Sequence, residues 1–379
     1  MSAAIQTQQG ALILDSHKLS YHMDRVQAWE AGERIAPVSV DMSLTRACGA
    51  MCTFCYAMMQ ESQARSSIKT SHALNLLDDF ATVGVRSVSL VSDGESTLSK
   101  AYVPFIQHAT SVGIDVGNAT NGWEWEPEKI EQVLPHLTWV RFTVAAGRPE
   151  SYASLMYKGP EHTEVFDRAM AHIRYAVDLK RRNHLPVTLG IQMVLMPHLK
   201  DEVIPFAQLG LDLGVDYAVI KHCSDDEQHT LGIDYSQYLG LNDLLKQAES
   251  MSSCQTKIIV KWDKIRDGDK PSYKRFYGPQ FLLQISGSGL VAPSGMFFNA
   301  RYSKLHIGNF TAERFIDIWK SERYWRAMNY LASPAFDAQT MMGTLPIQHY
   351  VSVALDNHAK GIEKIQPTVG PKPLHVNFL

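Results

Sequence analysis

Three cysteines lie close together in the first part of the chain: Cys48, Cys52 and Cys55. The whole chain has only five cysteines. Thiolates at this C-x3-C-x2-C spacing bind metal more readily than they pair as disulfides. A [4Fe–4S] cluster is normally held by four cysteines, so three leave one iron open to a cofactor or substrate. A structural zinc site with a distant fourth ligand is the alternative, but its usual paired C-x2-C knuckles are absent from the sequence.

Alternating strand and helix patterns surround this cysteine loop and must position it. Short β-rich segments are followed repeatedly by longer segments with helical spacing, and Ser71 is a plausible N-cap of the first such helix. This alternation predicts an α/β fold, a partial (β/α)6 parallel barrel with the helices outside. The predicted strands are 38–44, 85–91, 114–119, 138–144, 187–195 and 216–221, and the predicted helices are 71–83, 101–112, 127–134, 163–182 and 201–213.

The rhythm changes after about residue 235. We expect helices at 235–250, 313–331 and 351–358, and strands at 257–262 and 281–291, the second interrupted by a hairpin turn at 286–289. The aromatic residues Trp319, Tyr324, Trp325 and Tyr330 have helical spacing and are predicted to lie in the core. The predicted organisation is a lead-in (1–36), the barrel (37–235), a smaller α+β domain (236–360) and an extended tail (361–379).

Composition limits the classes of protein and partner. Of the 379 residues, 45% are apolar and 20% charged, as in ordinary globular proteins. The net charge of −3 gives no electrostatic reason to expect a nucleic acid or an anionic membrane as partner. We see no signal peptide in Met1–Gly10 and no apolar run long enough to cross a bilayer. With few cysteines outside the cluster, a cytoplasmic location is expected.

The cysteine loop, directly after a predicted strand and followed by Tyr56, resembles that of the radical S-adenosylmethionine (SAM) superfamily. The resemblance implies one [4Fe–4S] cluster on Cys48, Cys52 and Cys55, with SAM on the open iron. It also implies reductive cleavage of SAM to a 5′-deoxyadenosyl radical that abstracts hydrogen from a substrate. The electron would come from an external donor such as flavodoxin or ferredoxin.

Further stretches carry the resemblance, each at the end of a predicted strand. Asp93-Gly94-Glu95-Ser96 is similar to the family's Gly-Gly-Glu-Pro motif, which contacts the SAM amino group, although Asp93 and Ser96 depart from it. The residues that the resemblance implies as SAM contacts are Tyr56, Asp93, Gly94, Glu95, Asn118, Thr120, Asn121, Thr143 and Gln192. The two acids could instead be ordinary helix-start residues, and the residues at 118–121 could be simple turn residues.

The C-terminal region, residues 236–360, resembles the SPASM/twitch extensions of radical SAM enzymes, but without their cluster cysteines. Ser294 stands where the first cluster cysteine would be, and 341–346 contains none. This absence favours a single cluster and a redox-neutral outcome such as epimerisation, rearrangement or elimination.

Substrate chemistry is expected at the end of the sixth strand. Lys221 could bind a carboxylate or phosphate, and Cys223 could donate hydrogen to a substrate radical. A strand-end surface lysine and a small buried apolar cysteine are the alternatives. The leading hypothesis is a radical SAM enzyme acting on a polar small molecule, such as a sugar, nucleoside or amino-acid derivative. A peptide-modifying radical SAM enzyme is second, and a non-catalytic Fe–S protein is third.

Overall fold

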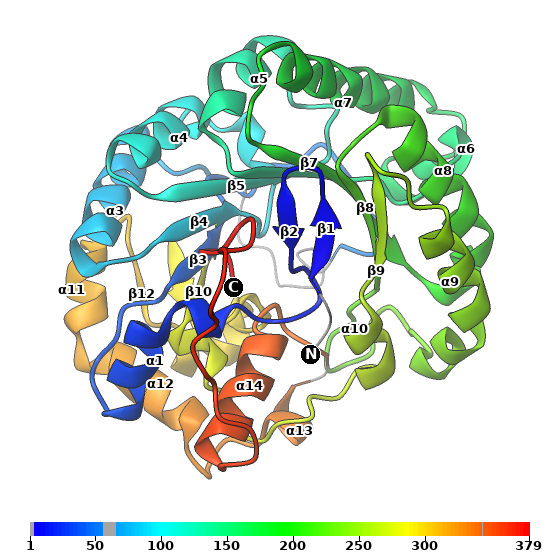
Figure 1. The fold of residues 1–379 in the computed structure, drawn as a ribbon. Coiled ribbons are helices and arrows are strands. Elements are labelled where there is room, and N and C mark those ends of the chain that lie inside the picture. The colour runs from blue at the N-terminus through cyan, green and yellow to red at the C-terminus, as the bar shows by residue number, and fades with distance from the viewer. Residues whose placement is uncertain (1–3, 56–65, 343) are drawn as a thin grey trace.

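A sheet of parallel strands curves around a central axis, and helices form the outer layer (Figure 1). The computed structural model describes residues 4–55, 66–342 and 344–379. Ten strands follow the order β12-β11-β10-β3-β4-β5-β6-β7-β8-β9, in which β10 and β3 through β9 run parallel. The last two strands, β11 and β12, are antiparallel to their neighbours. This architecture confirms the predicted α/β class with a parallel barrel-like sheet.

The strands are β1 (Ile5–Thr7), β2 (Gly10–Leu12), β3 (Ser39–Met42), β4 (Ser87–Leu90), β5 (Asp115–Thr120), β6 (Trp139–Thr143), β7 (Thr188–Leu195), β8 (Tyr217–His222), β9 (Lys257–Val260), β10 (Leu282–Ile285), β11 (Leu290–Ala292) and β12 (Gly308–Asn309). The helices are α1 (Met23–Glu30), α3 (Thr70–Val83), α4 (Tyr102–Ser111), α5 (Pro127–Val133), α6 (Pro149–Met156), α7 (Glu164–Arg182), α8 (Val203–Leu213), α9 (Asn242–Ser250), α10 (Trp262–Asp267), α11 (Phe315–Lys320), α12 (Glu322–Ala332), α13 (Ala338–Met341) and α14 (His349–Ala359).

Beyond residue 235, two strands join the parallel sheet of the barrel. β9 pairs with β8 and β10 pairs with β3, so both lie in register with strands of the predicted barrel. The hairpin predicted at 286–289 is confirmed, because β10 and β11 are antiparallel and Ser286 N–H donates to Leu290 O (2.9 Å). The predicted domain boundaries stay predictions.

The structure corrects several local expectations. Lys69, rather than Ser71, is the N-cap residue of α3. The helix predicted at 313–331 is two helices, because Ser321 is extended (ψ 148°) and its hydroxyl caps α12 by accepting from Tyr324 N–H. Helix α6 was not predicted. It is only eight residues long and begins with Pro149, so its periodic signal is short.

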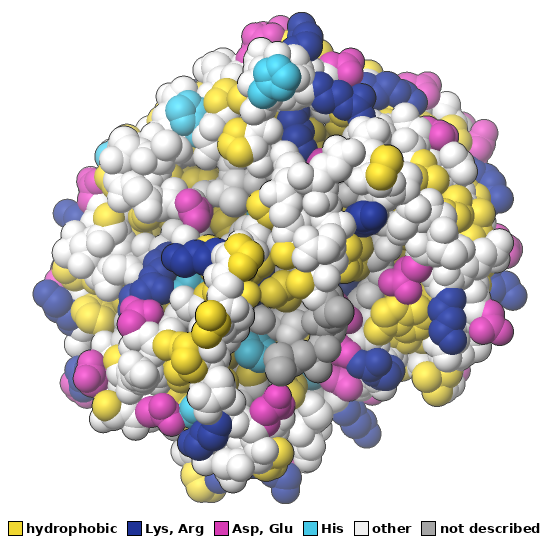
Figure 2. Space-filling model, viewed as in Figure 1, with side chains coloured by type: hydrophobic (Ala, Val, Ile, Leu, Met, Phe, Trp, Pro, Cys, Tyr) yellow, Lys and Arg dark blue, Asp and Glu magenta, His cyan; other side chains and the backbone are white. Residues whose placement is uncertain are grey.

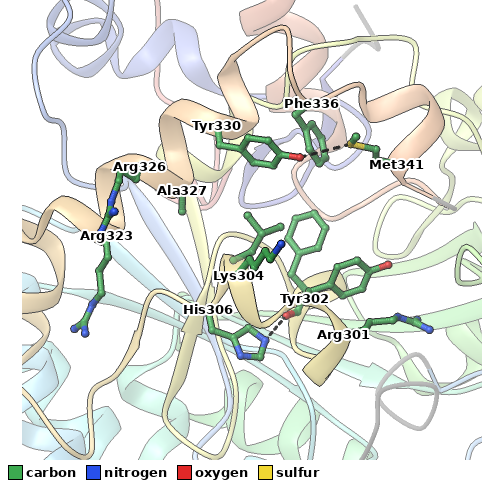
Figure 3. Close-up of a pocket in the computed structure, with 12 residues that line it drawn as sticks. Arg301, Tyr302, Lys304, His306, Arg323, Arg326, Ala327, Tyr330, Phe336 and Met341 are labelled. Atoms are coloured by element: carbon green, nitrogen blue, oxygen red, sulfur yellow. Dashed lines mark hydrogen bonds between the residues drawn. The ribbon is translucent and has the colours of Figure 1, made fainter.

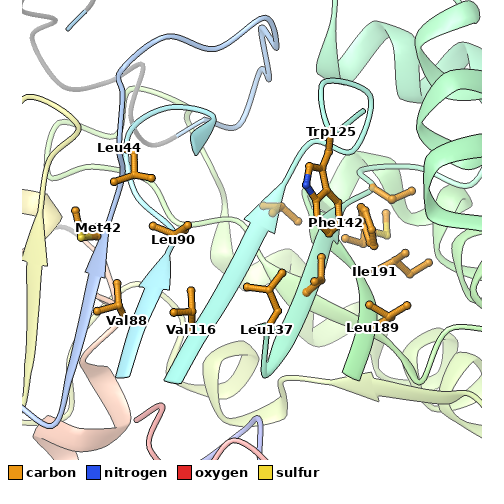
Figure 4. Close-up of a cluster of buried hydrophobic side chains, with 14 of the residues drawn as sticks. Met42, Leu44, Val88, Leu90, Val116, Trp125, Leu137, Phe142, Leu189 and Ile191 are labelled. Carbon is orange, nitrogen blue, oxygen red and sulfur yellow. The ribbon is translucent and has the colours of Figure 1, made fainter. Parts of the chain in front are cut away.

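The core lies between the sheet and the outer helices. Strand alternation turns Val40 and Met42 on β3, and Val88 and Leu90 on β4, toward the helix layer, where all four are buried. Figure 4 shows Met42, Val88 and Leu90 in this layer. The opposite face of each strand, which includes Asp41 and Ser89, therefore lines the barrel interior.

Two glycines in the interior make room for aromatic rings. A Cβ at Gly117 would lie 2.0 Å from the Trp139 ring, and one at Gly190 would lie 2.2 Å from the Tyr217 ring. Any side chain at either position would displace a ring, so both rings occupy the barrel interior because their neighbouring strands have no side chain there.

The N-terminal ends of the strands are covered by the β1–β2 hairpin and the C-terminal tail (Figure 1). Ser87 Oγ, at the start of β4, donates to Asn377 O (2.7 Å), and Asn377 Nδ2 donates to Asp115 Oδ2 (2.8 Å) at the start of β5. Positive and negative side chains are mixed around the rim of this face (Figure 2). Chemistry at the strand ends must therefore take place at the opposite, C-terminal edge.

None of the helices in the described part of the chain is long and apolar enough to cross a membrane.

Candidate functional site

The cysteine loop leaves the C-terminal end of β3 and is held against α6. Met51 N–H donates to Met156 O (3.0 Å) and Thr53 N–H donates to Leu155 O (2.9 Å). Phe54 is buried in the main core, while the three cysteines are each half-buried. The backbone of the loop is thus fixed, and its thiols lie between the core and the surface.

The thiols interact electrostatically with one another. Burial raises the pKa of Cys48 to about 12, with Glu95 as the next cause. Burial and the charges of Cys55 and Cys48 raise the pKa of Cys52. Metal binding must displace these thiol protons. Among the described residues, no three Cys, His, Asp or Glu side chains are already gathered at metal-ligand geometry, and no cysteine is in a disulfide. Thiolates repel one another, so the positive charge of the bound iron would hold the three ligands together.

Glu95 joins the cysteine loop to the loop after β5. Its N–H donates to Ala47 O (2.8 Å), next to Cys48. Its buried carboxylate accepts from Asn121 N–H (2.8 Å) and from the hydroxyl and N–H of Thr97 (2.8 and 3.3 Å). Burial raises the pKa of Glu95 to about 7. Glu95 also caps the short helix Ser96–Leu98, so the helix-start interpretation holds for this residue along with its wider role.

Gly94 allows the loop after β4 to approach the cysteine loop. Its φ is +138°, and a Cβ would lie 2.0 Å from Thr45 O and 2.9 Å from Arg46 Cα. The atoms that this Cβ would meet belong to the backbone of Thr45 and Arg46, so a change of side-chain rotamer could not relieve the clash. Only glycine fits here.

Asp93 binds the hairpin between β10 and β11. Its Oδ2 lies 3.1 Å from Arg46 Nε and accepts from Ser286 Oγ (2.6 Å), while its Oδ1 accepts from Gly287 N–H (2.8 Å). The carboxylate is buried, and Ser92 Oγ also donates to its Oδ1 (3.2 Å). It therefore connects the mouth of the barrel to the C-terminal region, a role that the sequence did not suggest.

The loop after β5 supplies a residue that the sequence did not single out. Glu124 Oε2 accepts from Gly49 N–H (3.2 Å) in the cysteine loop and from Asn121 Nδ2 (2.6 Å). A Cβ on Gly49 would lie 2.3 Å from Glu124 Oε1. The sequence shows only that Glu124 is an acidic residue three positions after Asn121, and this spacing is common in turns that have no function.

Asn118 and Thr120 face away from the barrel interior. They alternate with Gly117 on β5 and share the face of Val116, which packs in the core toward the helices. Thr120 Oγ1 accepts from Gly122 N–H (3.1 Å), whereas both side-chain polar atoms of Asn118 are buried without a partner. The structure thus brings Asn121 to the cysteine loop but places Asn118 in the helix-facing layer.

Thr143 and Gln192 are neighbours on the interior face of the barrel. They are direct partners in the β6–β7 register, and Lys221 lies on the interior face of the next strand, β8. Burial, followed by Lys264 and Arg141, lowers the pKa of Lys221 well below its usual value. Lys221 is therefore not an ordinary surface lysine at a strand end. Tyr56, also predicted as a cofactor contact, lies outside the described residues.

Cys223 is fully buried. Its N–H lies within hydrogen-bonding distance of Leu195 O (3.0 Å) and Tyr238 Oη (3.1 Å), and its thiol lies 3.7 Å from Ser224 O. Burial raises the pKa of this thiol to about 12. These contacts are those of a small core residue, and the hydrogen-donor role stays a prediction.

Comparison with known proteins identifies this arrangement. Residues 42–209 match the model of the radical SAM superfamily. The chain contains the radical SAM domain and is a radical SAM enzyme. The match begins in β3 and spans the cysteine loop, the Glu95 junction and the strands that carry Thr143 and Gln192.

Curated relatives of this radical SAM enzyme differ in what their names describe. It is 21% identical over 339 residues to the AdoMet-dependent heme synthase of Methanosarcina barkeri, which covers 86% of this chain and 92% of the relative. It is 30% identical over 101 residues to the sporulation killing factor maturation protein SkfB of Bacillus subtilis, which covers 27% of this chain and 24% of the relative.

Solved structures of low sequence identity share its fold. SuiB of Streptococcus suis, bound to its precursor peptide SuiA, has a TM-score of 0.60 at 14% identity and covers 81% of this chain and 69% of SuiB. Native anSMEcpe with bound AdoMet, which is SAM, has a TM-score of 0.57 at 11% identity and covers 86% of this chain and 98% of that one. The match to the radical SAM superfamily implies both SAM and an iron–sulfur cluster for this enzyme.

In the C-terminal region, hydrogen bonds surround the position where a cluster cysteine was expected. The buried hydroxyl of Ser294 lies 3.2 Å from the Oε1 atoms of both Gln284 and Gln348. Gln348 Nε2 in turn donates to Leu282 O (3.1 Å) and Pro293 O (2.9 Å). The site is filled by a neutral hydrogen-bond network.

A large cavity of about 800 Å³ lies beside this region (Figure 3). Aromatic and basic side chains line it, including Tyr302, Tyr330, Lys304 and Arg326. Tyr330 was predicted in the core, but it is 38% exposed and lines this cavity, because the buried stripe of α12 runs through Tyr324, Met328 and Leu331 and leaves Tyr330 outside it. Tyr324 and Trp325 are buried as predicted, and Trp319 is half-buried.

Proposed function

We propose that this radical SAM enzyme holds one [4Fe–4S] cluster on Cys48, Cys52 and Cys55 and abstracts hydrogen from a polar small molecule in the barrel, with a redox-neutral outcome. The observation that carries the proposal is the junction at Glu95. One residue binds both the cysteine loop, at Ala47 O, and the loop after β5, at Asn121 N–H.

The residues present fit the cluster and SAM. Three half-buried thiols on one backbone-anchored loop supply three ligands and leave one iron position open. When bound, the cluster supplies the electron that cleaves SAM to methionine and a 5′-deoxyadenosyl radical. The reducing electron would come from an external donor such as flavodoxin or ferredoxin.

The chain's own residues would orient SAM at the mouth of the barrel. Glu95 and Asn121 hold the two loops together, and Gly94 lets the backbone approach the cysteine loop closely. Thr143 and Gln192 present a hydroxyl and an amide side by side on the interior face. Tyr56, Asp93, Asn118 and Thr120 belong to the proposed contact set through the family resemblance. Asp93 would act through the hairpin that it binds.

The surroundings of Ser294 support a redox-neutral outcome. A second cluster could accept an electron from a substrate radical, but the described residues around Ser294 supply hydroxyl and amide groups and no thiolate. Without such an acceptor, the substrate radical would be resolved by rearrangement, elimination or return of hydrogen, for which Cys223 is the proposed donor.

A peptide substrate is the second candidate. The SuiB structure contains a precursor peptide, and SkfB is a maturation protein. The match to SkfB covers only about a quarter of each chain, whereas the match to the heme synthase extends over nearly the full length of both. A small-molecule substrate is therefore favoured.

Anaerobic reconstitution with iron and sulfide tests the proposal. With SAM and a strong reductant, the reconstituted protein should form 5′-deoxyadenosine, and Cys52→Ala should form none. Cys254→Ala is the matched control, since Cys254 is exposed and outside the cluster motif. If the reconstituted wild type forms no 5′-deoxyadenosine under any substrate condition, the proposal fails. If 5′-deoxyadenosine formation increases only when a peptide is added, the substrate is a peptide and not a small molecule.

A further inference from the structure

A small cavity inside the barrel collects basic side chains from several elements. Its volume is about 110 Å³, enough for several water molecules. Asp41 on β3, Ser89 on β4 and Arg141 on β6 line one side, and Lys261 and Lys264, on β9's C-terminal side and α10, line the other. Its walls also include the Trp139 and Tyr217 rings, and the N-terminal and C-terminal segments close it.

The strand register brings further positive charge to this cavity. Ile220 pairs with Val260, so the next residues, Lys221 and Lys261, are adjacent across β8 and β9. Lys261 N–H donates to Ile220 O (2.9 Å), which continues the pairing. Like charges in directly opposed positions repel each other, so this pair either loses protons or is held charged by a nearby anion.

These cations have no acidic partner. In the part of the chain that the structure describes, no ion pair involves Arg141, Lys221, Lys261 or Lys264. Lys264 is only 6% exposed, and its ammonium takes part in no hydrogen bond there. Arg141 Nε is buried without a partner, and the guanidinium lies 5.4 Å from the Trp139 ring centroid.

The two nearby carboxyls do not balance this charge. Asp15 already accepts hydrogen bonds from Tyr350 Oη and Asp263 N–H. Burial raises the pKa of Asp41 to about 7, so it is partly neutral at neutral pH. Burial also lowers the pKa of Lys261 to about 7 and that of Lys264 to about 8.

We propose that Arg141, Lys221, Lys261 and Lys264 bind an anionic group of the substrate, a carboxylate or a phosphate, inside the barrel. This inference rests on the proposed function and names the chemical class of its substrate. Buried cations that form no ion pair lower the stability of the folded protein. A bound anion would raise that stability through charge-assisted hydrogen bonds. The guanidinium offers planar donors and the lysines offer point charges, a combination that suits either anion.

The position of the four cations agrees with such a role. They lie on β6, β8 and the β9–α10 segment, on the same interior face of the sheet as Thr143 and Gln192. Arg141 precedes Thr143 by two residues on β6, so it lies closer to the N-terminal ends of the strands. A substrate held there by its anionic end would point its other end toward the mouth of the barrel, where the cysteine loop lies.

Binding of inorganic phosphate and of succinate to the reconstituted enzyme tests this inference. Calorimetry would give the Kd, and thermal unfolding would give the Tm with and without each anion. The variant is Lys264→Met, which keeps most of the length of the side chain but removes the charge. Lys246→Met is the matched control, because Lys246 is exposed on α9.

We expect at least one anion to bind the wild type and Lys246→Met, and to bind Lys264→Met about tenfold or more weakly. Tighter binding of phosphate indicates a phosphate ester, and tighter binding of succinate indicates a carboxylate. Without added anion, Lys264→Met should have a higher Tm than the wild type, because an unpaired buried cation has been removed. If this variant does not fold, Lys261→Met takes its place.

Three results would overturn the inference: no binding of either anion, equal binding by Lys264→Met, or a lower Tm of that variant without anion. The same preparation should be assayed for SAM cleavage without substrate. Cleavage without anion binding contradicts this inference alone, whereas anion binding without cleavage contradicts the proposed function alone.

Discussion

Among the residues that the structure describes, charged side chains have partners within the chain at the mouth of the barrel but form no ion pairs in its interior. At the mouth, Glu95, Asp93 and Glu124 each have partners within the chain and hold loops together. In the interior, neither Arg141 nor Lys264 forms an ion pair within the described chain, and Arg141 Nε is buried without a hydrogen-bond partner. Paired charges hold backbone segments in place, whereas an unpaired buried charge is unfavourable until a ligand of opposite charge binds it. The difference separates the part of the molecule that builds the cofactor site from the part that would select the substrate.

The largest expected effect is at the thiols of the mouth. Cys48→Ser should abolish iron retention after reconstitution, because an alcohol does not replace a thiolate ligand of an Fe–S cluster. Cys254→Ser should retain as much iron as the wild type, since its side chain is exposed. Iron and sulfide analysis after desalting measures both. Full iron retention by Cys48→Ser would exclude Cys48 as a ligand.

Next in size is the backbone contact at Gly94. Gly94→Ala places a Cβ 2.0 Å from Thr45 O at a φ of +138°, so the cysteine loop must shift. We expect the variant to lose most of its cluster and about 1–3 kcal/mol of stability. Gly240→Ala is the control, because no atom lies within 4 Å of its added Cβ. Equal cluster content and equal stability in the two variants would show that the close approach does not matter.

A smaller loss is expected when the Glu95 junction is removed. Glu95→Ala leaves the buried Asn121 N–H without an acceptor and should cost about 1–3 kcal/mol in the free energy of unfolding. Glu95→Gln keeps an acceptor oxygen and should lose less. Exposed Glu363→Ala should match the wild type in chemical denaturation. A stable Glu95→Ala variant with weakened SAM binding would instead give Glu95 a direct role at the cofactor.

The smallest effect is the pH dependence of stability from the interior cations. The folded pKa of Lys264 is about 8 and its ordinary value is 10.5, so between these values the unfolded chain binds more protons. Stability contributed by this group therefore rises as pH increases from about 8 toward 10. Lys264→Met should show a smaller rise when denaturation is measured from pH 7 to 10 without phosphate, because Lys261, whose pKa burial also lowers to about 7, still contributes. An identical pH profile in variant and wild type would place Lys264 in a more solvated setting.

Local patterns predicted the scaffold well. Apolar alternation and turn residues identified β3 to β8, and the spacing of Cys48, Cys52 and Cys55 pointed to the domain that the family match confirms. These signals succeed because they depend on neighbours within a few residues. The break at Ser321 was missed because a single capping hydroxyl overrides an otherwise continuous helical pattern.

Contacts between distant segments could not be predicted in the same way. Asp93 meets Ser286 across nearly 200 residues, and Glu124 meets Gly49 across 75. The interior cations became a group only through the β8–β9 register, which places Lys261 beside Lys221. The sequence pattern around each of these residues is that of an ordinary loop or surface, and only the folded chain gives them a shared site.

Iron and sulfide counting, combined with electron paramagnetic resonance of the reduced enzyme, tests the single-cluster claim most directly. The wild type should contain about four iron and four sulfide per chain, and SAM should change the spectrum of the reduced cluster. Replacing Ser294 by alanine should leave both results unchanged, because Ser294 only bonds Gln284 and Gln348. About eight iron per chain, or a spectrum that SAM does not alter, would contradict one SAM-binding cluster on Cys48, Cys52 and Cys55.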